Sequence, residues 1–206
     1  MYGVDVAVTR ADDLDRKLIQ HVADKGSSSV LDLGCGAGGQ SIRLSKGGVR
    51  VLGVDIQDFS KEFEVLRETN DLTVASLEFI QADVADLKRM LLSRRFDDCS
   101  VQRMLHYLPY QVAKELLADL RSRVNDRLYM SVTGLGTAIG ENYQDKQKEI
   151  GDRFCGLDKE DSETFSIEEP LCLYSKEEVE DLLKLTGWNI VESWVSAFGN
   201  IKIVAK

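Results

Sequence analysis

A glycine-rich turn between an apolar run and an amphipathic run constrains this chain more than any other feature. Residues 30–39 read Val-Leu-Asp-Leu-Gly-Cys-Gly-Ala-Gly-Gly and lead into a predicted helix over residues 40–46. A second apolar run, residues 51–54, ends at Asp55, nineteen residues after Gly36. A strand, a glycine turn and a helix, followed at this distance by an acid, are typical of adenosine cofactor sites. Glycine lets the backbone approach a ligand, and the acid can accept hydrogen bonds from ribose hydroxyls.

The composition fits one globular domain. At 206 residues the chain can bury its own core, and we expect a single domain over residues 1–206. With 26 Lys and Arg against 35 Asp and Glu, the net charge is −9, which argues against a surface that grips nucleic-acid phosphates. The four cysteines show no metal spacing, so no metal is expected. We find no signal peptide and no membrane-length apolar run, which favours a reducing cytoplasm.

Helical and strand patterns alternate along the chain. A helical extension is expected within residues 1–27, with its amphipathic helix at 10–24. Strands are predicted at residues 30–33, 50–55, 77–81, 96–104, 127–132, 188–195 and 200–205, and further helices at 60–69, 87–91, 111–124 and 175–186. The last two strands are joined by too few residues for a crossover, so they must pair antiparallel. We therefore expect an α/β fold: a three-layer, doubly wound, mostly parallel seven-stranded sheet with a C-terminal antiparallel hairpin.

Regular periodicity is lost between residues 133 and 173. Glycines, acids and isolated aromatics replace it over about forty residues. Loops of this length inside a domain are usually functional lids or partly helical insertions. We therefore expect residues 133–173 to close over a substrate.

Two kinds of adenosine cofactor fit the glycine turn. Residues 34–39 satisfy GxGxxG literally, as in NAD(P)-dependent oxidoreductases. Asp32, however, would place a carboxylate near a dinucleotide's pyrophosphate, whereas it suits a ligand that carries an ammonium and a sulfonium. The predicted C-terminal hairpin is also foreign to the usual dinucleotide fold.

The chain resembles the class I S-adenosylmethionine-dependent methyltransferases from about residue 28 to its C-terminus. Residues 30–38 match the first motif of that family, whose loop backbone cradles the methionine part of the cofactor. The stretch from Phe96 to Leu108, which contains Met-Leu-His-Tyr-Leu, resembles the fourth-strand motif more loosely. The resemblance implies S-adenosyl-L-methionine as cofactor, with binding residues Asp32, Gly34, Cys35, Gly36, Gly38, Asp55, Ile56, Asp83, Val84 and Gln102. Within that set, Asp55 would bind ribose, Ile56 would lie beside the adenine, and Asp83 would meet the adenine amino group.

Several of these residues also have a structural interpretation. Asp55 could cap the turn after its strand, and Asp83 could be the N-cap of the next helix. Cys35 can be explained by the need for a small side chain in the loop. His106 could be structural or catalytic, and His21 is expected at the surface.

Methyl transfer from a sulfonium is an in-line displacement, so orientation is the main contribution of an enzyme. If the accepting atom must lose a proton, His106 or Tyr107 is the best placed base, with Gln102 and Arg103 as possible binders. The amino-methyltransferase signature, Asn or Asp followed by Pro-Pro and an aromatic, is absent after the fourth strand. A small-molecule acceptor is therefore expected, a protein acceptor comes second, and nucleic acid and membrane partners are not expected. A non-catalytic subunit that binds the same cofactor would carry identical motifs.

Overall fold

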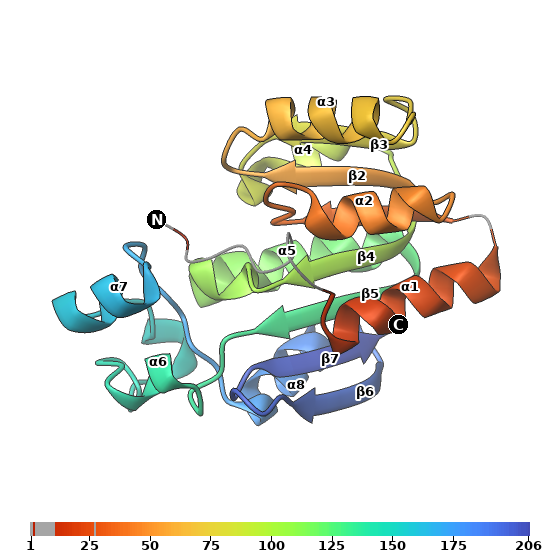
Figure 1. Ribbon diagram of the computed structural model, residues 1–206. Coiled ribbons are helices and arrows are strands. Elements are labelled where there is room, and N and C mark those ends of the chain that lie inside the picture. Colours follow the sequence, from red (N-terminus) through yellow and green to blue (C-terminus); the bar gives the residue numbers. More distant parts are fainter. Residues whose placement is uncertain (1, 3–10, 27) are drawn as a thin grey trace. The chain divides into compact units, whose positions relative to one another are not determined.

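The computed structural model describes residues 2, 11–26 and 28–206 (Figure 1). The chain forms two compact units. We name them the β1–β4 unit, with described residues 11–26, 28–102 and 122–129, and the C-terminal unit, with residues 2, 103–121 and 130–206. Each unit is described by itself, and the expectation of a single domain stays a prediction. Across the described ranges, no helix combines the length and apolar character needed to cross a bilayer.

A seven-stranded sheet confirms the expected fold class. Its strand order is β3 (Leu77–Gln81), β2 (Arg50–Asp55), β1 (Ser29–Leu33), β4 (Phe96–Gln102), β5 (Val124–Val132), β7 (Ile201–Ala205) and β6 (Ile190–Val195). β1 pairs in parallel with β2 and β4, and β2 pairs in parallel with β3. β6 and β7 form the predicted antiparallel hairpin. The apolar runs of β1 and β2 are almost wholly buried, as expected for central parallel strands.

The helices of the β1–β4 unit follow their sequence patterns closely. They are α1 (Asp13–Lys25), α2 (Gly39–Lys46), α3 (Ser60–Thr69) and α4 (Leu87–Leu91), with a 3-10 turn, η2 (Val84–Asp86), before α4. α1 buries Leu14, Leu18 and Val22, the predicted apolar stripe. It begins at a capping box formed by Asp12 and Asp15. Residue 10, the predicted start of this helix, lies outside the described residues.

In the C-terminal unit, α8 (Lys176–Leu185) begins at a capping box of Ser175 and Glu178. Gly187, with a φ of +85°, lies just after α8 and does not continue the helix. Trp188 is buried and donates its indole N–H to the Leu117 carbonyl oxygen at 3.0 Å. Leu117 belongs to α5 (Tyr110–Arg123).

The insertion at residues 133–173 is partly helical. It contains α6 (Ala138–Glu141), η4 (Ile150–Asp152) and α7 (Lys159–Phe165). Its own small core is formed by Tyr143, Ile167, Leu171 and Leu173, against which Tyr107 packs. The Tyr143 hydroxyl donates to the Leu171 carbonyl oxygen inside this core. The insertion is therefore a packed segment.

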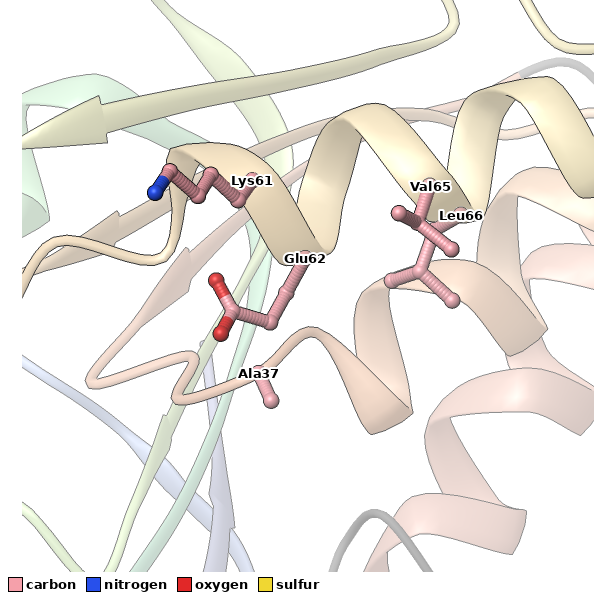
Figure 2. Close-up of a pocket in the computed structure, with 5 residues that line it drawn as sticks. All are labelled: Ala37, Lys61, Glu62, Val65 and Leu66. Carbon is pink, nitrogen blue, oxygen red and sulfur yellow. The ribbon is translucent and has the colours of Figure 1, made fainter.

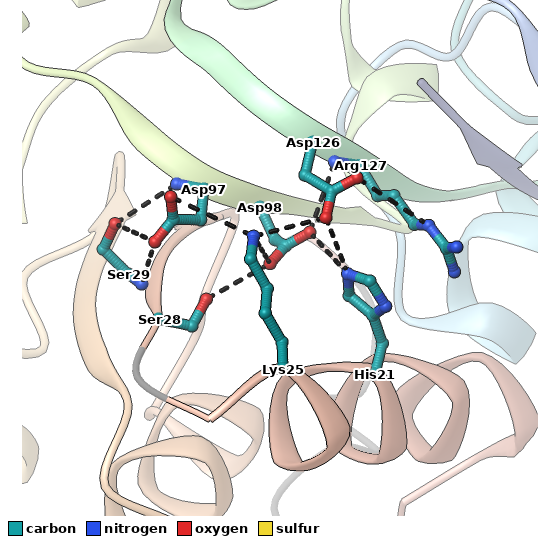
Figure 3. Close-up of polar contacts among 8 residues, drawn as sticks. All are labelled: His21, Lys25, Ser28, Ser29, Asp97, Asp98, Asp126 and Arg127. Carbon is teal, nitrogen blue, oxygen red and sulfur yellow. Dashed lines mark hydrogen bonds and ion pairs between the residues drawn. The ribbon is translucent and has the colours of Figure 1, made fainter.

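A charged network corrects the expectation that His21 lies at the surface (Figure 3). The His21 side chain is only 17% exposed, and its Nε2 lies 3.3 Å from Asp98 and 3.1 Å from Asp126. Lys25 lies 3.2 Å from Asp126 and 3.8 Å from Asp98. Burial raises the pKa of Asp98, whereas the positive charges of His21 and Lys25 oppose that rise. The network ties α1 to the first residues of β4 and β5, because a buried carboxylate requires such partners.

Candidate cofactor site

The four strands of the β1–β4 unit end at the same edge of the sheet. In the register of the strands, Leu33 lies beside Val54 and Val101, and Asp55 lies beside Gln81. The segments that follow β1, β2 and β3 therefore start next to one another. Ligands bind at this carboxyl edge in open α/β sheets.

The glycine loop after β1 has a backbone that few other residues could adopt. Gly34, Gly36 and Gly38 have φ values of +68°, +52° and +82°. In this left-handed region a Cβ atom costs roughly 1–2 kcal/mol per residue. The Gly34 N–H donates to the Val54 carbonyl oxygen at 2.8 Å, so the loop starts anchored on β2.

Asp55 completes the anchoring of the loop. Its Oδ2 accepts the Gly36 N–H at 2.9 Å, and its Oδ1 accepts the Gln57 N–H at 3.0 Å. The turn-capping role considered from the sequence is therefore present. A carboxylate oxygen has more than one acceptor site, so these bonds leave room for the predicted ribose hydroxyls.

Asp32 and Cys35 are held on the buried side of the loop. The Asp32 carboxylate accepts the Ser41 hydroxyl of α2 at 2.6 Å, which fixes the start of that helix to β1. Cys35 is buried, and a Cβ at Gly53 would come within 2.9 Å of its Sγ. A larger side chain at position 35 would meet the same wall, so packing accounts for the small residue.

The residues predicted to meet adenine lie after β2 and β3. Ile56 is 47% exposed, although it is a large apolar residue, and the Gln81 side chain holds its carbonyl oxygen at 3.1 Å. Asp83 caps η2, since its Oδ1 accepts the Ala85 N–H at 2.9 Å. Asp83 is exposed and Val84 is half-buried. The structure thus confirms the N-cap role of Asp83.

A groove of about 330 Å³ lies between the glycine loop and α3 (Figure 2). It is lined by Ala37, Lys61, Glu62, Val65 and Leu66. None of the predicted cofactor residues lines this groove. Its walls are apolar side chains of α3 and the methyl group of Ala37, with Lys61 and Glu62 at one end.

The sequence patterns did not predict that Asp15 lies at the carboxyl edge of the sheet. Its side chain accepts the Gln102 Nε2 at 2.5 Å and the Asp12 N–H at 2.8 Å, and the residue is 4% exposed. Burial raises the pKa of the Asp15 carboxyl, and the bonds from Asp12 and Gln102 oppose that rise. Asp15 therefore holds the side chain of Gln102, a predicted cofactor residue. The only sequence signal was the Asp-x-x-Asp of the capping box.

His106 and Tyr107, the predicted candidates for a base, lie in η3 (Leu105–Tyr107) of the C-terminal unit. The His106 ring is 2% exposed and lies against Thr133, whose N–H donates to Nδ1 at 3.4 Å. Burial, helped by the charge of Arg103, lowers the pKa of His106 to about 3. The Tyr107 hydroxyl donates to the Tyr2 carbonyl oxygen at 2.7 Å, and burial raises its pKa to about 12. The predicted role of His106 or Tyr107 as a base stays a prediction.

The glycine loop on β1, the acids after β2 and β3 and the antiparallel end of the sheet define the class I Rossmann-like methyltransferase fold. Residues 30–126 match the family model described as Methyltransferase domain. Over these residues the chain is therefore similar to methyltransferase domains, and its fold is that of the S-adenosylmethionine-dependent methyltransferases, as the resemblance implied.

Solved structures of methyltransferases share this fold. The 1,6-didemethyltoxoflavin-N1-methyltransferase of Burkholderia thailandensis, solved with S-adenosylhomocysteine, has a TM-score of 0.70 and 18% identity over 97% of this chain and 77% of its own. The magnesium protoporphyrin IX methyltransferase of Synechocystis PCC 6803, also solved with S-adenosylhomocysteine, has a TM-score of 0.64 and 21% identity over 93% of this chain and 80% of its own. An O-methyltransferase family 2 protein of Planctomyces limnophilus in complex with apigenin has a TM-score of 0.61 and 16% identity over 96% of this chain and 62% of its own.

The bond between Asp15 and Gln102 should couple α1 to the end of β4. In a double-mutant cycle of Asp15→Ala and Gln102→Ala, we expect a coupling free energy of about 1.5–3 kcal/mol, because the acceptor is a buried carboxylate. Urea unfolding of the four proteins measures it. The control cycle combines Asp13→Ala, in the same turn of α1, with Gln102→Ala. The two changes in the free energy of unfolding should there be additive. A coupling for Asp15 as small as that for Asp13 would contradict a stabilising bond.

Proposed function

We propose that the enzyme transfers the methyl group of S-adenosylmethionine to a small organic molecule. Three fold neighbours are named for, or complexed with, small molecules: 1,6-didemethyltoxoflavin, magnesium protoporphyrin IX and apigenin. The net charge of −9 and the missing amino-methyltransferase signature disfavour nucleic-acid bases. The observation that carries the proposal is the carboxyl edge of the β1–β4 unit, where the glycine loop and Asp55 meet.

In this proposal each residue at the edge has a defined part. The backbone of Gly34, Cys35, Gly36 and Gly38 surrounds the methionine part of the cofactor, because the three glycines leave no Cβ atom between the backbone and a ligand. Asp32 and Gln102 lie beside the same methionine part of the cofactor. Asp55 binds the ribose hydroxyls. Ile56, Asp83 and Val84 surround the adenine, with the exposed side chain of Ile56 against the ring.

The cofactor part of the proposal predicts a change in stability. S-adenosylhomocysteine at one hundred times its Kd should raise the free energy of unfolding by about 2.7 kcal/mol, and NAD(P) should not. Gly36→Val should abolish the effect, since valine does not accept a φ of +52°. Asp55→Ala should weaken it, because the Gly36 N–H loses its acceptor. Thermal melts with and without ligand measure these shifts.

The matched control for this experiment is Asp58→Ala. Asp58 lies three residues after Asp55, is exposed and caps the Ser60 N–H. Its variant should keep the full ligand shift. Equal loss in the Asp55 and Asp58 variants would contradict a specific role for Asp55.

The acceptor part of the proposal is tested by following the methyl group. The enzyme is incubated with S-adenosylmethionine that carries a tritiated methyl and with a cell extract divided by size into small molecules and macromolecules. We expect label in the small-molecule fraction, and none with Gly36→Val. Label confined to the protein fraction would overturn a small-molecule acceptor and leave the cofactor site intact.

We further propose that the insertion at residues 133–173 covers the acceptor. Its core packs against Tyr107, which follows the end of β4 closely in sequence. A covered site keeps water away from the sulfonium and the accepting atom.

Limited proteolysis with trypsin tests whether the insertion covers the acceptor. Lys148 and Lys159 of the insertion are 55% and 90% exposed at their side chains, and Lys184 of α8 is 62% exposed. Cleavage after Lys148 and Lys159 should slow when S-adenosylhomocysteine is present, whereas cleavage after Lys184 should not change. Equal cleavage of the insertion with and without ligand would count against a lid.

A further inference from the structure

The charged network between α1, β4 and β5 has the ligand types of a metal site (Figure 3). It brings together one imidazole and two carboxylates, from His21 of α1, Asp98 of β4 and Asp126 of β5. One ligand atom from each of these residues lies within 4.8 Å of those from the other two. All three residues belong to the β1–β4 unit. An imidazole nitrogen and carboxylate oxygens are ligands that Zn²⁺ accepts.

The distances around His21 fit tetrahedral coordination. A tetrahedral zinc ion with bonds of about 2.0–2.1 Å holds its ligand atoms about 3.3 Å apart. His21 Nε2 lies 3.3 Å from Asp98 Oδ1 and 3.1 Å from Asp126 Oδ2. Zinc can therefore take the place of a proton between Nε2 and the carboxylates with little movement of the imidazole, which then carries its proton on Nδ1.

Asp98 is held in position by groups that a metal ion would leave in place. Its side chain is fully buried, and its two oxygens accept the Ser28 hydroxyl and the Arg127 N–H, each at 3.2 Å. Such bonds orient the ligands of metal ions in the same way. Burying a carboxylate costs free energy unless positive charge lies beside it, so a cation next to Asp98 stabilises the fold.

Lys25 is the group that zinc has to displace. Its ammonium lies 3.2 Å from Asp126 Oδ2, the oxygen that also faces His21, and 3.8 Å from Asp98 Oδ2. Lys25 is the last residue of α1, and its side chain is 31% exposed. A lysine side chain in this position can turn its ammonium into water while its methylene groups stay on the surface.

The charges around the cluster leave room for a further cation. Asp97 adds a third carboxylate, 4.0 Å from the Lys25 ammonium, and Arg127 adds a guanidinium, 4.0 Å from Asp126. When His21 is neutral, the carboxylates therefore outnumber the positive charges. A divalent ion stabilises such a group more than a single ammonium does, because the attraction grows with the charge.

A buried hydroxyl lies beside His21 without a hydrogen bond. Tyr129 of β5 is 1% exposed, and its hydroxyl has no hydrogen-bond partner among the described residues. The centroid of its ring is 6.1 Å from that of the His21 ring. Buried hydroxyls normally have a protein or water partner. Zinc with three protein ligands carries a water in its fourth position, which brings a hydrogen-bonding group into these surroundings.

We propose that His21, Asp98 and Asp126 bind a zinc ion that fastens α1 to β4 and β5. The site is separate from the candidate cofactor site, because Asp98 and Asp126 are each the third residue of their strand, whereas the glycine loop follows the last residue of β1. It does not depend on the proposed function. No sequence spacing predicts it, since its ligands come from three elements far apart in the chain, and the expectation of no metal was based on the cysteines.

Calorimetric titration of the metal-free enzyme with Zn²⁺ tests the site. We expect one zinc ion per chain. His21→Gln and Asp126→Asn should each weaken binding at least about tenfold, since loss of an outer partner of a ligand already costs that much. The Asp126 side chain is 34% exposed, so the loss of its charge should leave the fold intact. The matched control is Asp24→Asn, an exposed acid of α1 outside the cluster, which should keep full affinity.

Two further measurements identify the ligands. Co²⁺ in place of zinc should give the strong visible absorption of tetrahedral coordination, without the ultraviolet band of a bound thiolate. Lys25→Gln should bind zinc more tightly than the unchanged enzyme, because the competing ammonium is gone. Circular dichroism of every variant separates loss of binding from loss of fold.

Four results would each overturn the proposal. They are absence of zinc binding, equal affinity in the unchanged enzyme and in folded His21→Gln and Asp126→Asn, a thiolate band with Co²⁺, and weakening by Lys25→Gln as large as that by Asp126→Asn. The last result would show that zinc does not take the place of the ammonium and that the cluster is only an ion-pair network.

Discussion

The hydrogen bond from the Gly36 N–H to the Asp55 carboxylate holds together the edge on which the β1–β4 unit depends. It joins the loop after β1 to the end of β2 at 2.9 Å, beside the bond from Gly34 to Val54. Without it, a loop with three residues at positive φ would gain conformational freedom that binding would have to remove. The carboxylate proposed to bind ribose thus also preorganises the loop backbone that is proposed to surround the methionine part of the cofactor.

Local sequence patterns predicted most of the elements, and the errors fall where two patterns overlap. Val124 fits the apolar stripe of the helix before it, but it is the first residue of β5, because α5 passes into the strand without a loop. A β-branched residue suits both patterns, so spacing alone does not separate them. β4 was predicted to reach Met104 and ends at Gln102, since the left-handed turn at Arg103 cannot continue a strand.

The contacts between polar side chains could not be predicted from the sequence, for a different reason. Gln102 meets Asp15 across 87 positions, and His21 meets Asp126 across 105. Each of these residues looks like an ordinary polar position on a helix or at a strand end. Only the packing of α1 beside β4 and β5 brings them together as part-buried pairs. The glycine loop could be predicted because all its determinants lie within one βα unit.

The charges of the described edge segments agree with the chemistry of methyl transfer from a sulfonium. The β1–β4 unit carries acids at its ligand edge, Asp15, Asp32 and Asp55, which suit a cofactor with an ammonium and a sulfonium. Each of these carboxylates already accepts a hydrogen bond from the protein, from Gln102, Ser41 and Gly36 respectively. Their positions are therefore fixed before a cofactor arrives, so binding has less side-chain freedom to remove.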